Sequence, residues 1–122
     1  MKTTIHEKPD GKVAEIYSDG VQFSTVQNIL DLMANLDYDI RKIIIYEENI
    51  NPQFFNLKTG LAGDILQKFV NYKMQLAIVG DFSKYPGKSL QDFIRESNQG
   101  RQIFFVDSIE TALIRLTGAR TG

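Results

Sequence analysis

Residues 55–63 of the 122-residue chain read FNLKTGLAG and form the segment whose residue types best suit a chemical role. A hydroxyl residue such as Thr59 at the start of a helix ordinarily serves as its N-cap. The same position suits an anion, because free N–H groups and the helix macrodipole concentrate positive charge there. Lys58 adds a cation, and Gly60 and Gly63 make the first turn small enough for close backbone approach. We therefore predict a phosphoacceptor or anion site at Thr59, Lys58 and Gly60, with simple helix capping as the alternative.

Three acidic residues directly follow apolar runs that are typical of buried strands. Glu47 follows KIIIY, Asp81 follows QLAIVG, and Asp107 follows QIFFV. Sites in open α/β sheets form beyond the carboxyl ends of the strands, and Mg²⁺ prefers carboxylate ligands. The three residues are therefore weak candidates for a metal site, although Asp107 is also explained as a helix cap and loop acids are usually solvated. We predict no metal or other cofactor.

The composition excludes several classes of catalytic site. Cysteine is absent, which rules out disulfides and thiolate chemistry, and the one histidine, His6, cannot build a histidine-rich metal centre. The glycines of residues 60–63 lack the spacing of a dinucleotide-binding turn, and no Walker sequence is present. We interpret His6 as a half-exposed strand residue and predict no catalytic residue.

Length and charge are those of one small globular protein. We expect a single α/β domain over residues 1–118 and a frayed tail over residues 119–122. The 14 basic and 15 acidic side chains give a net charge of −1, which favours neither nucleic acid nor an acidic membrane as a partner. The start of the chain lacks the pattern of a secretory signal, and no apolar run approaches the roughly 20 residues of a membrane span. These features predict a cytoplasmic protein.

Hydrophobic periodicity predicts alternating strands and helices. The three apolar runs are strands buried on both faces, and a proline–glycine turn joins two earlier strand-like runs into a hairpin. Stripes of apolar residues near the helical period follow the hairpin and each buried strand. The expected strands are Thr3–Glu7, Lys12–Tyr17, Lys42–Tyr46, Gln75–Gly80 and Gln102–Val106, and the expected helices cover 24–35, 59–72, 89–97 and 107–118.

The fold class follows from the order ββαβαβαβα. Strands separated by helices form right-handed crossovers, which produces a parallel sheet with helices on both faces. The hairpin adds its first strand antiparallel at an edge. The sequence therefore predicts a mixed, mainly parallel sheet of about five strands. Capping pairs are expected at Ser24 with Gln27, at Ser89 with Asp92 and at Asp107 with Glu110.

This element order, with a glycine-containing turn after the first buried strand, resembles the STAS domain (sulfate transporter and anti-sigma-factor antagonist). In antagonist members the matching loop carries an Asp-Ser-Ser-Gly-Leu-Gly type motif, and a kinase-like anti-sigma partner phosphorylates the serine before the glycine. Thr59, Gly60 and Leu61 match the hydroxyl residue, the glycine and the leucine, whereas Leu57 and Lys58 replace the acidic residue and the first serine. The resemblance implies a non-enzymatic regulatory domain, an anti-sigma-like kinase or other regulator as partner, and phosphorylation of Thr59.

Three passages also resemble a family of small bacterial proteins catalogued only as a domain of unknown function. They are FNLKTGLAG at 55–63, AIVGDFS at 77–83 and ESNQGR at 96–101. This resemblance implies a bacterial, cytoplasmic protein and carries no known activity.

Three functional hypotheses remain open. The first is a STAS-like protein-interaction domain that uses the loops at the carboxyl edge, with Phe54 and Phe55 as partner anchors unless they are buried. The second is a small-molecule binder or weak enzyme that uses the same edge, and the third is a homo-oligomer that pairs through the edge of the hairpin. The candidate interaction surface comprises Phe54, Phe55, Asn56, Leu61, Asp81, Ser83 and Tyr85.

Overall fold

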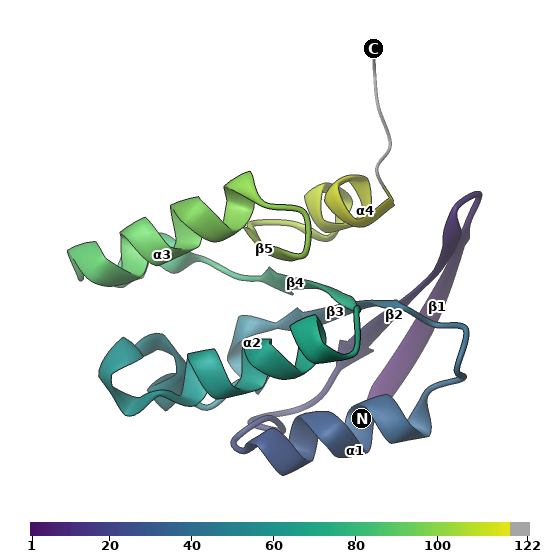
Figure 1. Ribbon diagram of the computed structural model, residues 1–122, viewed down its shortest axis with the longest axis horizontal. Helices are drawn as coiled ribbons and strands as arrows, with labels where there is room; N and C mark the ends of the chain where they lie inside the picture. The colour runs from purple at the N-terminus through teal and green to yellow at the C-terminus, as the bar shows by residue number, and fades with distance from the viewer. Residues whose placement is uncertain (118–122) are drawn as a thin grey trace.

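The computed structural model of the chain describes residues 1–117. The predicted helix end at Gly118 and the predicted tail over 119–122 lie outside these residues. The predicted order ββαβαβαβα is confirmed, with short 3₁₀ helices in the loops (Figure 1). The strands are β1 (Lys2–Lys8), β2 (Gly11–Tyr17), β3 (Lys42–Tyr46), β4 (Gln75–Val79) and β5 (Ile103–Val106). The α-helices are α1 (Val26–Asn35), α2 (Leu61–Asn71), α3 (Lys88–Gln99) and α4 (Ile109–Thr117), and the 3₁₀ helices are η1 (Glu47–Asn49), η2 (Pro52–Phe55), η3 (Leu57–Thr59) and η4 (Phe82–Lys84).

The strands form one five-stranded sheet in the order β1-β2-β3-β4-β5. β1 pairs antiparallel with β2, and every later pair is parallel, which confirms the predicted mixed, mainly parallel sheet. In register, Val13 lies opposite Lys42, and Ile43 lies opposite Leu76. β1 is an edge strand, so pairing of two copies of the chain through its outer side stays a prediction.

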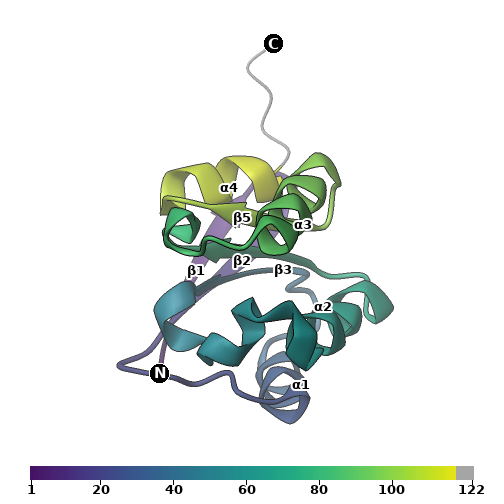
Figure 2. The same ribbon diagram turned by 90° about the vertical axis from the view of Figure 1, so that its left-hand side faces the viewer.

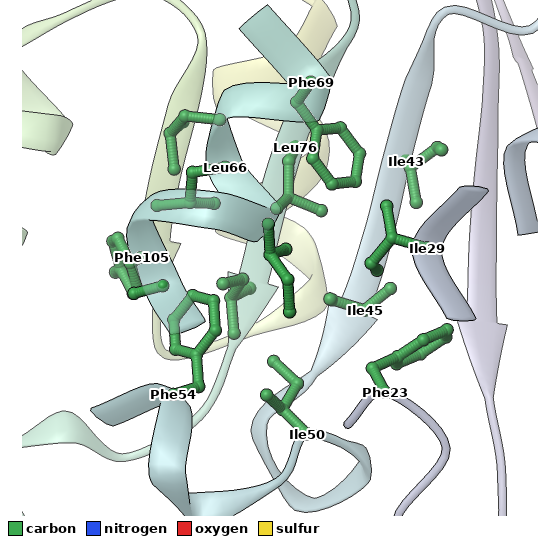
Figure 3. Packing of buried hydrophobic residues seen from close by; sticks show 14 of the residues in the cluster. Phe23, Ile29, Ile43, Ile45, Ile50, Phe54, Leu66, Phe69, Leu76 and Phe105 are labelled. Atoms are coloured by element: carbon green, nitrogen blue, oxygen red, sulfur yellow. The ribbon is translucent and has the colours of Figure 1, made fainter. Parts of the chain in front are cut away.

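Helices lie on both faces of the sheet, as predicted (Figure 2). The larger core cluster joins one face to α1, α2, α3 and η2. Figure 3 shows its side chains converging, with Ile29 of α1 and Phe69 of α2 near Ile43 of β3. The smaller cluster packs Ala112 and Leu116 of α4 against the opposite face. Burial of both sheet faces explains why the central strands are almost wholly apolar.

The helix starts differ from the predicted capping pairs. At α1 the capping box is formed by Thr25, whose Oγ1 accepts a hydrogen bond from the Asn28 N–H at 3.1 Å, and not by Ser24 and Gln27. At α4 the Ser108 hydroxyl accepts from the Thr111 N–H at 3.1 Å, in place of Asp107 with Glu110. Each of these helices starts beside two neighbouring residues that can both act as an N-cap, Ser24 and Thr25 at α1 and Asp107 and Ser108 at α4. The residue types alone therefore do not decide which of the two caps the helix.

At α3, Gly87 is the N-cap residue, and no side chain there makes a capping bond. The predicted cap, Ser89, lies inside the first turn. Asp92 instead forms ion pairs with Lys88 at 2.7 Å and Arg95 at 2.9 Å. None of the helices described within residues 1–117 combines the length and apolar character that crossing a lipid bilayer requires.

Candidate functional site

The candidate site lies where β3 and β4 end at the same edge of the sheet. Because these strands are parallel, η1 after β3 and η4 after β4 emerge side by side. The segment with η2 and η3 then leads into α2 at this edge. We call residues Asn56–Gly63 together with Asp81–Tyr85 the η3–η4 surface.

Glu47 joins the end of β3 to η4. Its side chain is buried, yet its carboxylate is fully engaged: Oε1 accepts from the Asp81 N–H at 3.2 Å, and Oε2 accepts from the Lys84 ammonium at 2.7 Å and from the Tyr85 hydroxyl. Burial and the bond to Glu47 raise the pKa of the Tyr85 phenol, and the bond to Glu47 also raises the pKa of Lys84. Both groups therefore keep their protons and continue to donate to the carboxylate at neutral pH.

Gly80 is required for this arrangement. A Cβ atom at Gly80 would lie 2.5 Å from both the Cβ and Oε1 of Glu47. Any larger residue at this position would displace the buried carboxylate or the end of β4. Gly80 and Lys84 are therefore residues of the candidate site that the sequence did not indicate, since only the fold brings them to Glu47.

Aromatic stacking connects η4 to η2. The Tyr85 ring stacks on the Phe55 ring, with centroids 4.8 Å apart and planes inclined by 16°. Phe55 also contacts Phe54 edge-on, with centroids 4.9 Å apart. Phe54 and Phe55 are 1% and 6% exposed, and Phe54 points into the core in Figure 3. The structure thus shows the buried alternative, and neither ring is an exposed partner anchor, because both pack in the core cluster between η2 and the sheet.

Thr59 lies on the surface with its hydroxyl bound to the backbone. Its Oγ1 lies 2.9 Å from the carbonyl oxygens of Gln53 and Asn56 and accepts from the Leu61 N–H at 3.2 Å. The helix α2 begins at Leu61, two residues later than predicted, and Gly60 is its N-cap residue with φ +79°. The hydroxyl thus contacts the helix start from the preceding 3₁₀ turn.

The rest of the helix start is open. Lys58 is exposed, and the Asn56 side chain accepts from the Lys58 N–H at 3.3 Å. A Cβ atom at Gly63 would meet no atom within 4 Å outside the neighbouring backbone of its own helix, so within the described residues no other segment packs closely on this glycine. Leu61 is half-buried against the core. Gly63 and Asp64 are exposed while Ala62 is buried, so one side of the first turn of α2 faces the surface.

A cavity of about 500 Å³ adjoins this turn. It separates η2 and η3 from the start of α3 and is lined by both Lys58 and Lys88. The remaining lining residues are Phe55, Asn56, Leu57, Gly87, Ser89 and Leu90. Lys58 and Lys88 thus flank this hollow, and the Lys88 ammonium forms an ion pair with Asp92 at 2.7 Å.

The predicted carboxylate cluster does not form. Asp81 turns back on its own loop, where Oδ1 accepts from the Ser83 N–H at 3.1 Å and the Ser83 hydroxyl at 2.6 Å; these bonds lower the pKa of Asp81. Glu47 is held by Lys84 and Tyr85. Within residues 1–117 no three carboxylate or imidazole side chains, those of Glu47, Asp81 and Asp107 included, group in a way that could hold a metal ion.

A second cavity, of about 390 Å³, lies between the ends of β4 and β5. Its polar lining includes Asp81, Ser83, Asp107, Thr111 and Arg115. Arg115 was not predicted as a site residue, because its helical spacing gives no sign that it reaches the sheet edge. Its lining combines hydroxyl, carboxylate and guanidinium groups, the kinds of polar group that orient a small polar ligand.

A comparison with protein-family models matches residues 8–116 to a domain of unknown function, DUF4180. No curated protein and no solved structure matches the chain. The match covers the site and nearly all the described residues. It confirms the predicted resemblance to a family catalogued as a domain of unknown function.

Proposed function

The chain belongs to the DUF4180 family, and from this premise we propose that it is a non-enzymatic, STAS-like protein-interaction domain whose η3–η4 surface is switched by phosphorylation of Thr59. The observation that carries the proposal is the position of the Thr59 hydroxyl, which is exposed and bridges η2, η3 and the first turn of α2. A single modification there would act on three segments of the surface.

The modification replaces the hydroxyl proton of Thr59 with the terminal phosphoryl group of a nucleoside triphosphate. A partner kinase, anti-sigma-like or another regulator, would catalyse the transfer and release the nucleoside diphosphate and a proton. The product carries about −1.5 to −2 charge at neutral pH. Lys58 and the free N–H groups at the start of α2 would attract this charge.

Phosphorylation would also break an existing contact. The Thr59 hydroxyl can donate to the carbonyl of Gln53 in η2 or of Asn56, each 2.9 Å away, and a phosphate without that proton cannot. Its negative oxygens would be repelled by the same carbonyls. The phosphate would therefore favour the α2 side of the turn and release η2.

A movement of η2 would be transmitted to η4 through side-chain contacts. Phe55 in η2 stacks on Tyr85, and the Tyr85 hydroxyl donates to Glu47, which anchors η4. A shift of η2 would thus change the packing under Asp81–Tyr85. A partner that contacts both loops would distinguish the two states of the chain.

The test has two parts, one that detects phosphorylation of Thr59 and one that compares the proteins bound by the wild type and by variants. Mass spectrometry of the chain isolated from its native cells should place a phosphoryl group on Thr59. A Thr59→Glu variant should change the set of bound proteins, whereas Thr59→Ser, which keeps the hydroxyl, should not. An unmodified Thr59 together with identical partner sets for wild type and Thr59→Glu would reject the proposal.

The cavity between β4 and β5 favours a second candidate function, a binder of small polar molecules or a weak enzyme. Arg115 lines this cavity together with Ser83 and Thr111, and its guanidinium donates to the Asn98 carbonyl and lies over the Phe104 ring. Phosphorylated metabolites should then raise the melting temperature of the wild type and not of an Arg115→Met variant. Equal shifts in both proteins would exclude this cavity as their binding site.

A further inference from the structure

The sheet face that carries α4 has a region that this helix does not cover. α4 packs mainly on β4 and β5, and its Leu116 lies in the same apolar cluster as Val13 of β2. Side chains alternate along a strand, so Glu15 and Tyr17 share the face of Val13 beyond the helix. Tyr46 of β3 lies against the same small cluster, and β1 adds His6. Figure 1 shows the hairpin β1–β2 at the edge of the sheet, to one side of α4.

Hydrogen bonds order the side chains of this region. The Glu15 carboxylate accepts from His6 Nε2 at 2.8 Å and from the Tyr46 hydroxyl. The Tyr17 hydroxyl donates to Glu48 Oε2 at 3.0 Å. The rings of Tyr17 and Tyr46 meet edge-on, with centroids 5.5 Å apart and an angle of 85° between planes. The aromatic side chains are therefore preorganised.

We call this region the tyrosine–carboxylate face, and it consists of His6, Glu15, Tyr17, Tyr46, Glu48 and Glu110. Tyr17 is 39% exposed, Glu48 and Glu110 are exposed, and Tyr46 is half-buried. The face therefore combines accessible aromatic rings with accessible charges.

The charge around the two phenols is predominantly negative. The Tyr46 phenol lies in the negative field of three carboxylates, those of Glu15, Glu48 and Glu110. The Tyr17 phenol lies in that of Glu48 and Asp19. The basic groups near Glu15 are Lys2 and His6. The pKa of Tyr46 is raised by burial, by the bond to Glu15 and by these carboxylates; the pKa of Tyr17 is raised chiefly by its bond to Glu48. Both phenols stay protonated at neutral pH, and the faces of their rings attract a cation through the ring quadrupole.

We propose that the tyrosine–carboxylate face docks a basic, extended segment of a partner protein, with an arginine or lysine side chain over the tyrosine rings and its charge directed at Glu48 and Glu110. Carboxylates beside aromatic rings complement such a side chain in both charge and shape. The strands β1 to β3 span two inter-strand spacings, about 10 Å, which suits a chain segment better than a single small cation. This face lies across the sheet from η3 and α2 and is independent of Thr59.

The experiment uses a synthetic peptide of alternating arginine and valine residues as the probe. Its titration should shift the backbone amide NMR signals of β1, the end of β2 and the end of β3, with an affinity that falls as salt is added. A Glu48→Gln/Glu110→Gln variant should bind the peptide about tenfold more weakly. Tyr17→Ser should weaken binding while Tyr17→Phe, which keeps the ring, should retain it.

A matched variant controls for net charge. Asp31→Asn/Glu96→Gln removes two exposed carboxylates from α1 and α3 and should bind the peptide as the wild type does. Equal weakening in both double variants would overturn the proposal, because the attraction would then be that of the whole molecule. Shifts confined to other surfaces, or equal affinity for spermine, would overturn it as well.

Discussion

The aromatic ring of Tyr85 stacks on that of Phe55 at 4.8 Å while its hydroxyl donates to a buried carboxylate, so one side chain connects η2, η4 and the end of β3. The contact joins the two halves of the η3–η4 surface through the interior of the protein. Loss of these Tyr85 contacts should lower the free energy of unfolding and also change partner binding.

Tyr85→Phe should lower the free energy of unfolding by about 1–3 kcal/mol, because the buried Glu47 carboxylate loses one of its donors while the ring stack remains. Tyr38→Phe is the control, since Tyr38 is 93% exposed and its change should have no measurable effect. Urea unfolding at neutral pH measures the free energy of unfolding of both variants. Equal stability of the two variants would show that the hydroxyl contributes nothing.

Gly80→Ala and Gly63→Ala should change stability in opposite directions. The new methyl group at residue 80 would lie 2.5 Å from Glu47, and overpacking of this kind costs about 1–3 kcal/mol. At residue 63, in the first turn of α2, the methyl group meets nothing and alanine favours the helix by up to about 1 kcal/mol. Thermal unfolding of the pair tests the prediction, which fails if Gly80→Ala is as stable as the wild type.

Thr59→Val should destabilise the chain by about 0.5–1.5 kcal/mol, because the isosteric side chain can neither donate to η2 nor accept from the Leu61 N–H. Thr59→Ser keeps both contacts and should stay close to the wild type. Hydrogen exchange of the amides in η3 and the first turn of α2 would locate the effect. Unchanged exchange in the valine variant would contradict the assigned role of the hydroxyl.

Glu15 should make stability depend on pH in the acid range. Burial raises the pKa of its carboxyl, but the hydrogen bonds from Tyr46 and His6 outweigh this and hold the pKa below its ordinary 4.5. Because the folded-state pKa is depressed, the stabilisation is present above pH 4.5 and is lost as the pH falls through the folded-state value. Glu15→Gln should therefore show a shallower loss of stability on acidification than the wild type, measured by urea unfolding across this range.

An exposed carboxylate provides the comparison for Glu15. Glu96→Gln, on the surface of α3, should follow the acid profile of the wild type. If Glu15→Gln and Glu96→Gln have the same profile, the hydrogen-bonded cluster of Glu15 has no part in the acid response.

The sequence predicted the strands and helices well because their patterns are local. The run KIIIY forms β3 with the predicted bounds, since a continuous β-branched segment has few alternatives to a buried strand. The cap of α1 was misplaced by one residue because Ser24 and Thr25 are both suitable. Such errors change the description of a helix end and leave the topology intact.

The candidate site was less predictable because its contacts join distant segments. Glu47 was expected in a polar loop, yet Lys84 and Tyr85 allow it to be buried. Phe54 and Phe55 are indistinguishable in the sequence from exposed anchors, and only the packing of η2 on the core shows otherwise. The expected N-cap, Thr59, was placed one residue too early, since Gly60 is the N-cap of α2, although the Thr59 hydroxyl still accepts from the Leu61 N–H.

The place of His6 beside Glu15 also supplies a spectroscopic reporter. The chain contains one histidine, so every imidazole resonance in its NMR spectrum arises from this residue. These signals will respond to changes at Glu15 and to molecules that settle on the surrounding tyrosines. Occupancy of that face can thus be followed in the unlabelled, unmutated protein through the imidazole signals of this one residue.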